Sequence, residues 1–145
     1  MKKILYDNQM FTFQRFGGVT RYFADLMYNL PGGEFVSEVP MKYCENHYVT
    51  ETYGHKHERM TFPKNYRIRR RIYSLVNDRI AKYALKHNDY DIFHPTYFNP
   101  YFLNILRKRQ KPFVLTVHDM TFERYPQDVL IYDRTIPNKK HLIAE

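Results

Sequence analysis

Residues 3–8 read KILYDN, and together with residues 9–33 they decide the fold. A short apolar run that ends at the polar pair Asp7-Asn8 is typical of a buried parallel strand. After Gly17-Gly18, apolar residues recur at steps of three and four from 19 to 30, and PGG at 31–33 closes this helical face. A strand, a glycine pair and a helix in this order predict the start of an α/β unit.

The rest of the chain continues this alternation. Periodicity and turn residues predict a strand near Phe35, Val36 and Val39, loops with at most one strand over 42–64, and a helix over 66–87. They then predict a strand at 91–94 that Pro95 stops, and a short helix with a basic end within 99–109. The clearest strand is predicted over 111–117, and a helix is predicted to start at 138–145. We therefore expect an α/β fold with a Rossmann-like, doubly wound, mostly parallel sheet flanked by helices. It would form one domain over residues 1–145.

Composition limits the classes of function. A net charge of +8 predicts attraction to polyanions: nucleic acid, anionic membranes or phosphorylated ligands. The single cysteine, Cys44, excludes an internal disulfide, and the apolar run at the start is too short for a signal peptide or a membrane span. We expect a cytoplasmic protein. His47, His55, His57 and Glu58 lack the accompanying ligands of a zinc motif, so we expect a polar surface loop and no metal.

Polar side chains lie directly after three of the expected strands. Asp7-Asn8, His94 and His118-Asp119 occupy these positions, and ligands of doubly wound sheets gather at such carboxyl ends. His118 has the chemistry of a hydrogen-bond donor or a general base, with Asp119 as the carboxylate that orients it. The alternative is a structural histidine that caps a strand.

Two loops offer further candidate binding groups. RFGGVTR at 15–21 combines a backbone that a ligand can approach at Gly17 and Gly18 with the phosphate-attracting side chain of Arg21. HPTYFNP at 94–100 carries Tyr97, whose ring suits a sugar or an acyl chain. A tight turn without a ligand and a rigid loop that packs its rings into the core are the respective alternatives.

The helix over 66–87 is basic and amphipathic. Its apolar stripe is formed by Ile68, Ile72, Leu75, Val76, Ile80, Tyr83 and Ala84, and seven Lys and Arg residues flank it. Such a helix either lies on an anionic membrane or packs its stripe on the sheet and shows its charges to water. We expect the second arrangement, because the sheet needs a cover.

Three blocks together resemble one enzyme family. They are 4–9 leading into 15–23 (ILYDNQ to RFGGVTRYF), 89–97 (DYDIFHPTY) and 111–120 (KPFVLTVHDM), and their order and spacing resemble the N-terminal half of glycosyltransferase family 4 enzymes. The resemblance implies a GT-B architecture of two Rossmann-like domains, with the acceptor bound by the N-terminal domain and the nucleotide-sugar donor by the C-terminal one. It also implies transfer with retention of anomeric configuration, no metal, and no cofactor besides the donor as co-substrate.

The same resemblance assigns roles to residues. It implies that His118, the candidate catalytic residue, contacts the transferred sugar, that Gly17 and Gly18 approach the donor, and that His94 and Tyr97 lie on the acceptor side. The family's Glu-rich donor motif does not occur in residues 1–145. We therefore expect an acceptor-side piece that is inactive alone. Its expected partners are a C-terminal domain and a glycan or lipid-linked acceptor. Contact of the helix over 66–87 with an anionic membrane stays open as the alternative to its packing on the sheet.

Two other classes of function stay open. One is a non-catalytic α/β module that holds an anionic or phosphorylated ligand. The other is a nucleic-acid-binding domain, which the charge and the many aromatic residues suggest. It is disfavoured because the basic residues concentrate on one expected helix, while the aromatic residues are spread along the chain.

Overall fold

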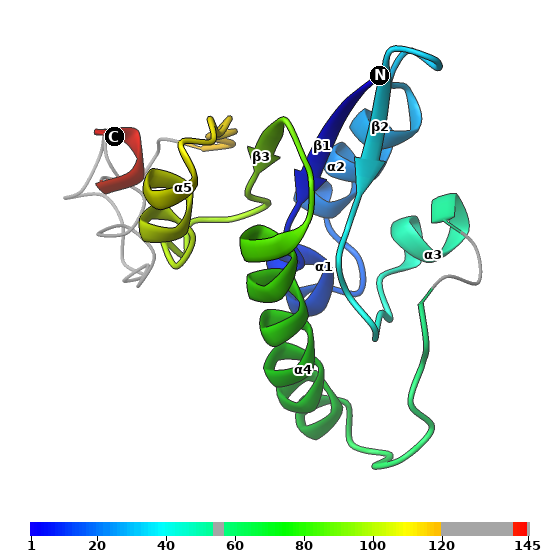
Figure 1. Cartoon of the computed structure of the whole chain (residues 1–145). Coiled ribbons are helices and arrows are strands. Elements are labelled where there is room, and N and C mark those ends of the chain that lie inside the picture. The colour runs from blue at the N-terminus through cyan, green and yellow to red at the C-terminus, as the bar shows by residue number, and fades with distance from the viewer. Residues whose placement is uncertain (54–56, 120–140, 145) are drawn as a thin grey trace, which may run out of the picture.

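The computed structural model describes residues 1–53, 57–119 and 141–144 (Figure 1). It is an α/β fold, in which a three-stranded parallel sheet is flanked by helices. The elements in chain order are β1 (Lys2–Tyr6), α1 (Gln9–Phe13), α2 (Gly18–Tyr28), β2 (Phe35–Glu38), α3 (His47–Tyr53), α4 (Tyr66–His87), β3 (Ile92–His94) and α5 (Leu103–Arg109). This arrangement is consistent with a Rossmann-like fold, although the sheet is small.

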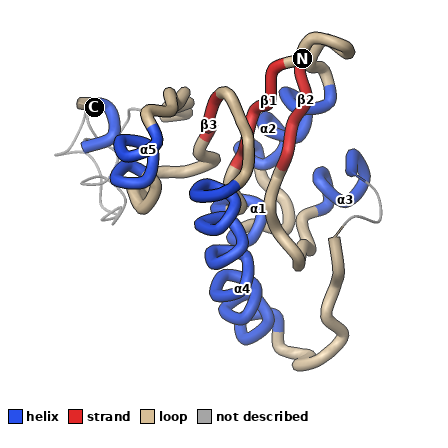
Figure 2. Tube along the Cα trace, viewed as in Figure 1, coloured by secondary structure: helices blue, strands red, loops and turns tan. Residues whose placement is uncertain are grey.

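The central strand is β1, and the sheet order is β2-β1-β3 with both pairings parallel. Leu5 lies opposite Glu38 of β2 and Phe93 of β3. Figure 2 shows how short the strands are beside the helices. The expected strands at 3–6, near 35–39 and at 91–94 are confirmed with small shifts of their ends.

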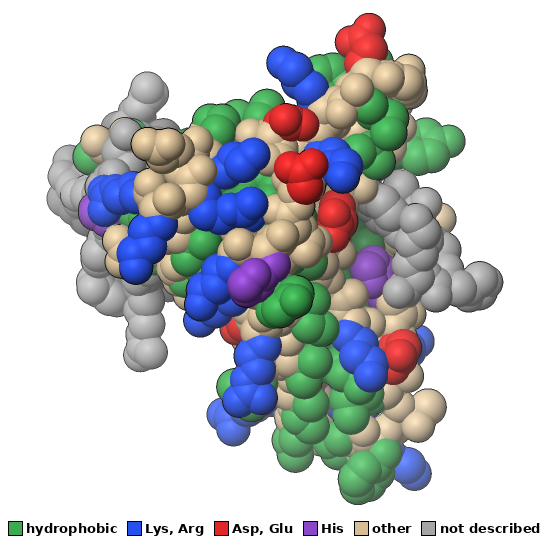
Figure 3. Space-filling view, in the orientation of Figure 1, with side chains coloured by type: hydrophobic (Ala, Val, Ile, Leu, Met, Phe, Trp, Pro, Cys, Tyr) green, Lys and Arg blue, Asp and Glu red, His purple; other side chains and the backbone are tan. Residues whose placement is uncertain are grey.

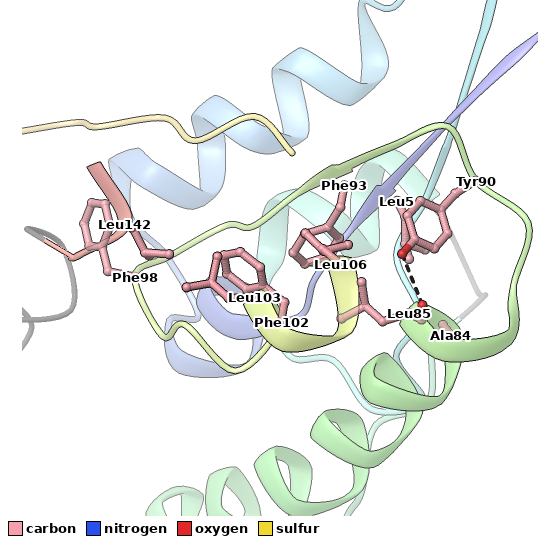
Figure 4. Close-up of a cluster of buried hydrophobic side chains, with 10 residues drawn as sticks. All are labelled: Leu5, Ala84, Leu85, Tyr90, Phe93, Phe98, Phe102, Leu103, Leu106 and Leu142. Atoms are coloured by element: carbon pink, nitrogen blue, oxygen red, sulfur yellow. Dashed lines mark hydrogen bonds between the residues drawn. The ribbon is translucent and has the colours of Figure 1, made fainter. Parts of the chain in front are cut away.

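The two faces of β1 belong to two different hydrophobic clusters, because successive side chains of a strand point to opposite faces. Leu5 and Phe93 pack with Leu85 of α4 and Leu106 of α5 (Figure 4). Ile4 and Tyr6 pack on the other face with α2. Helices therefore cover both faces of the sheet.

Local signals account for the ends of the main helices. Asn65 caps α4, where its side-chain oxygen accepts a hydrogen bond from the Arg67 N–H at 2.9 Å. Pro31 lies just after the end of α2, and the chain then turns at Gly33, whose φ of 86° favours glycine. The expected helices over 66–87 and within 99–109 are confirmed. At the end of the described chain, residues 141–143 are helical and Leu142 is buried in the cluster around Leu5.

The strand expected over 111–117 is wrong. This segment forms one parallel bridge to β3, between Phe113 and Phe93, and otherwise runs as a loop (Figure 2). The Phe93 N–H donates to the Pro112 carbonyl at 3.1 Å, and the Val114 N–H donates to the Phe93 carbonyl at 2.9 Å. Because β3 has three residues and Pro95 comes right after it, there is little strand edge for a longer ladder.

The structure has two short helices that the sequence did not predict. α1 comes directly after β1, and α3 lies inside 42–64, where a parallel bridge between Tyr43 and Glu58 is a further short pairing. Both helices are short and lack a clear apolar period. Tertiary packing therefore specifies them, through Phe11 and Val49 in the cluster on the α2 side of the sheet.

The expected packing of α4 is also wrong. Its buried residues are Arg69, Tyr73, Asn77, Ala81, Ala84 and Leu85. Of the apolar stripe that the sequence predicts to pack on the sheet, only Ala84 is buried. Ile72, Val76 and Ile80 are half-buried, and Ile68, Leu75 and Tyr83 are exposed. Because the sheet is small, only Ala84 and Leu85 of α4 pack in the hydrophobic cluster on the sheet. The polar part of the helix is buried against α1 and the loop before α3. No described helix combines the length and the apolar character needed to cross a membrane.

Candidate functional site

Hydrogen bonds of Asp7 connect the segments that follow β1 and β3. The carboxylate is fully buried, and its Oδ1 accepts hydrogen bonds from the Thr96 N–H at 2.8 Å and the Thr96 hydroxyl at 2.6 Å. The Gln9 side-chain amide donates to Oδ2 at 2.5 Å. Burial raises the pKa of Asp7, and the hydrogen bonds from Thr96 and Gln9 oppose that rise. These bonds hold the loops after both strands in one place.

His94 faces α2 because of the strand register. It is the partner of Tyr6 across the sheet, and the two rings stack with centroids 5.3 Å apart. Its Nε2 lies 2.9 Å from the Thr116 hydroxyl oxygen, and its ring meets Phe23 of α2 edge-on at 5.1 Å. Burial and the neighbouring His118 lower the pKa of His94 to about 4. The imidazole is therefore neutral near pH 7 and suits a structural hydrogen bond better than a proton relay.

His118 lies at the same edge but is exposed. Its ring contacts Tyr22 at 5.1 Å and Phe23 at 5.6 Å, both on α2. It therefore shares Phe23 as a neighbour with His94. The structure thus brings two of the expected site histidines together beside the helix that the glycine pair begins.

The glycine pair and Arg21 stand at the start of α2. Gly17 caps the helix, and a Cβ atom there would overlap Oε1 of Gln14. Gly18 is exposed, and a Cβ there would meet nothing within 4 Å. Arg21 is exposed and lies 3.5 Å from the Asp25 carboxylate. Asp119 is exposed as well, next in the chain to His118.

Tyr97 is separated from the histidines and lines a cavity of about 540 Å³. The cavity lies between α1, the loop after β3 and one side of α4, and neither His94 nor His118 lines it. It is lined by Asn8, Gln9, Met10, Thr12, Phe13, Arg70, Arg71, Ser74, Asp78, Tyr97 and Asn99. A concave space with a few polar groups and aromatic walls is typical of a small-molecule site.

The polar wall of this cavity is built around Asp78. The Asn8 amide donates to Asp78 Oδ1 at 3.0 Å, and the Ser74 hydroxyl donates to Asp78 Oδ2 at 3.0 Å. Asn8 is 1% exposed, and its Oδ1 has no hydrogen-bond partner within the described part of the chain. Further along the same side of α4, the Arg70 guanidinium lies 4.9 Å from the Phe13 ring centroid. The cavity therefore offers hydrogen-bond acceptors, aromatic rings and cations.

Sequence reasoning missed most of this cavity. It singled out Tyr97 and placed Asn8 after a strand, but it treated α4 only as a basic amphipathic helix. Asp78 is the one acidic residue in the 22 residues of α4, and an isolated carboxylate in a basic helix was the available signal. The periodicity of the sequence gave no signal for α1, which brings Phe13 against Arg70.

A second polar cluster surrounds Glu45, which is buried beside the amino-terminal half of α4. The Arg69 guanidinium donates to both carboxylate oxygens, at 2.7 and 3.2 Å, and the Tyr73 hydroxyl donates at 2.9 Å. Burial raises the pKa of Glu45, but these hydrogen bonds and the Arg69 charge outweigh it, so the pKa is lowered. The carboxylate also lines a second cavity of about 420 Å³. Because each of its oxygens has a donor, the cluster is structural.

The residues considered for a metal do not form a described cluster. His47 pairs with Glu51 at 2.7 Å, His57 Nδ1 lies 3.2 Å from the Met41 carbonyl, and His55 lies outside the described residues. Over residues 1–53, 57–119 and 141–144, no three His, Cys, Asp or Glu side chains gather in a way that could hold a metal ion.

Comparisons of the chain with protein-family models, with curated proteins and with solved structures found no match. The assignment of function therefore depends on the residues at the carboxyl edge of the sheet and on the resemblance that the three sequence blocks carry.

Proposed function

We propose that this chain is the acceptor-side domain of a retaining glycosyltransferase with GT-B architecture. In this proposal the sheet of the domain is doubly wound and Rossmann-like. The observation that carries the proposal is the cavity beside the carboxyl ends of β1 and β3. It adjoins the loops that hold Asn8, Tyr97 and Asn99. In parallel α/β sheets this edge is where ligands bind.

The chemistry of the cavity suits a saccharide. Sugar hydroxyls need several hydrogen-bond acceptors and donors at fixed positions, and Asp78, Asn8 and Asn99 offer them. The C–H faces of a sugar ring pack on flat side chains, and Tyr97 offers such a face at the cavity wall.

In this proposal the donor approaches the α2 side of the sheet and not the cavity. His118 and Gly18 are exposed, and the ring of His118 contacts Tyr22, about one helical turn after Gly18 on α2. The open space over Gly18 would let a donor sugar come close to the backbone. His118 would contact the transferred sugar, and Arg21 and Asp119 would border it. A C-terminal domain would bind the nucleotide-sugar, no metal would take part, and transfer would occur in the cytoplasm. The chain alone would therefore bind acceptor without turning over donor.

The first test is acceptor binding by the chain itself. Mono- and oligosaccharides are titrated against the protein and monitored by saturation-transfer difference NMR. Binding should weaken at least about tenfold in Tyr97→Leu, which keeps an apolar side chain but removes the ring, and in Asp78→Asn, which removes the charged acceptor. Glu51→Ala on α3 lies outside the cavity and is the control. No saccharide binding, or binding that both variants leave unchanged, would contradict the proposal.

A second candidate function is a non-catalytic module for an anionic ligand. Arg70 and Arg71 border the same cavity, and this favours a phosphorylated or carboxylated molecule. Inorganic phosphate and neutral sugars separate the two. If phosphate alone binds, and Arg70→Gln abolishes that binding, the module is the better description. Turnover of a nucleotide-sugar by residues 1–145 alone would contradict both.

A further inference from the structure

The apolar stripe of α4 is exposed on the surface. Ile68 is 48% exposed, Leu75 63% and Tyr83 64%, while Ile72, Val76 and Ile80 between them are half-buried. Figure 3 shows hydrophobic side chains running along α4, with Lys and Arg on either side. At 3.6 residues per turn these positions share one side of the helix. The stripe is thus a continuous apolar surface several turns long.

The exposed side of α4 is also strongly basic. Arg67, Arg71, Arg79, Lys82 and Lys86 are exposed, and none of them forms an ion pair with a described carboxylate. The one acidic residue of the helix, Asp78, is turned toward Asn8 and Ser74. Arg69 is the buried exception, paired with Glu45. The outward side therefore combines apolar residues with uncompensated positive charge.

We propose that this face of α4 attaches the protein to an anionic lipid surface. The helix would lie along the membrane plane, with Leu75 and Tyr83 at the level of the headgroups and the acyl boundary and Arg79 beside lipid phosphates. Apolar residues on one side with Lys and Arg around them are the pattern of interfacial helices, and a tyrosine ring suits the boundary of lipid and water. Each basic residue near an anionic bilayer adds attraction.

Charge and apolar character argue against two other occupants of this face. A second copy packed on the same stripe would bring Arg79 and Lys86 against the basic residues of an identical helix, with like charges opposed. A nucleic acid would satisfy the charges but would leave Leu75 and Tyr83 against a polar backbone. An anionic bilayer satisfies both the charges and the apolar residues.

The attachment has a consequence for the cavity. Arg70, Arg71, Ser74 and Asp78 line the cavity from one side of the same helix. A helix lying on a membrane would therefore hold the cavity opening close to the headgroups. The attachment itself does not depend on the proposed function, since it uses the exposed side of α4 and not the cavity.

The test is co-sedimentation of the full chain with vesicles. We expect binding to vesicles that contain phosphatidylglycerol in phosphatidylcholine, weaker binding at high salt, and little binding to phosphatidylcholine alone. Leu75→Ser with Tyr83→Ser should lower the partition coefficient at least about tenfold, and so should Arg79→Glu with Lys86→Glu. Neither pair includes a residue that lines the cavity of about 540 Å³.

Matched controls change the same properties elsewhere. Tyr28→Ser with Val114→Ser removes two exposed apolar residues away from α4, and Lys2→Glu with Lys108→Glu makes the same change of charge. Both controls should keep most of the binding, and circular dichroism should show every variant folded. The proposal is overturned if phosphatidylglycerol vesicles do not bind the chain or if the α4 variants bind no less than their controls. It is equally overturned if the chain forms a dimer that Leu75→Ser dissociates.

Discussion

The carboxylate of Asp7 accepts two hydrogen bonds from Thr96, one from the backbone N–H at 2.8 Å and one from the hydroxyl at 2.6 Å. The two residues are 89 positions apart in the chain and lie just past the ends of neighbouring strands. The Thr96 hydroxyl oxygen also accepts a hydrogen bond from the Met10 N–H at 3.1 Å, so the start of α1 joins the same network. The candidate site is built on this junction.

Thr96→Val should lower the free energy of unfolding by about 2 to 3 kcal/mol, because it keeps the side-chain shape but removes a donor to a buried carboxyl and an acceptor for a buried N–H. The pKa of Asp7, already raised by burial, should rise further. Urea denaturation monitored by circular dichroism measures the loss. Thr96→Ser retains the hydroxyl and should lose less. Equal stability of the Val variant and the wild type would show that the Thr96 hydroxyl does not contribute.

His94 should make stability depend on pH in a defined window. Burial lowers its pKa to about 4 in the folded chain, from an ordinary value near 6.5, so the unfolded chain binds the extra proton first. The contribution is full above pH 6.5 and is lost as the pH falls toward 4, by roughly 3 kcal/mol in total. Urea midpoints across about pH 4 to 8 measure this.

His94→Phe is the control for this window, since it keeps a ring on Tyr6 and removes the titration. It should flatten the pH profile between 4 and 6.5 even if it is less stable overall. A wild-type profile without a slope there would show that His94 is accessible to protons in the folded chain.

Asn77 should be among the costliest polar residues to remove. It is fully buried, its Oδ1 accepts from the Lys42 and Tyr43 N–H groups at 3.0 and 3.1 Å, and its Nδ2 donates to Thr12 at 3.0 Å. Asn77→Ala removes the acceptor of two part-buried backbone N–H groups and one of the two donors to Thr12 Oγ1, and should cost about 2 to 4 kcal/mol. Arg79→Ala, exposed on the same helix, should change stability by less than about 0.5 kcal/mol. Thermal unfolding of both variants measures the two changes in stability. Similar losses in Asn77→Ala and Arg79→Ala would contradict the structural role of Asn77.

Gly18→Val and His118→Ala test the donor side of the proposed site. Both positions are exposed and a side chain at Gly18 meets no atom within 4 Å, so both variants should fold normally. In an enzyme that includes the donor domain, transfer should fall roughly 100-fold, because each change alters the place of the donor sugar. Gly32→Val, at another open position in the turn before β2, is the matched control. Near-normal transfer by both site variants would make the site assignment wrong.

The sequence by itself determined the alternation of strands and helices. Residues 3–6 and 91–94 are short apolar runs closed by polar residues or proline, and 66–87 has a capping asparagine before it. These are local signals, and the structure has β1, β3 and α4 there. The sequence also led us to expect His94 and His118 near one another, and in the structure both rings contact Phe23, although the strand expected before His118 is reduced to a bridge at Phe113.

Only the tertiary structure decided which side of α4 is buried. Periodicity ranks sides by apolar character and favours the stripe through Leu75, but the buried side carries Arg69, Tyr73 and Asn77. These polar residues are buried because Glu45 and the backbone at 42–43 supply partners, and that pairing joins segments at least 24 residues apart. Hydrogen-bond partners distant in the chain leave no mark on local periodicity. The same long-range packing created the cavity around Asp78 and left the apolar stripe on the surface.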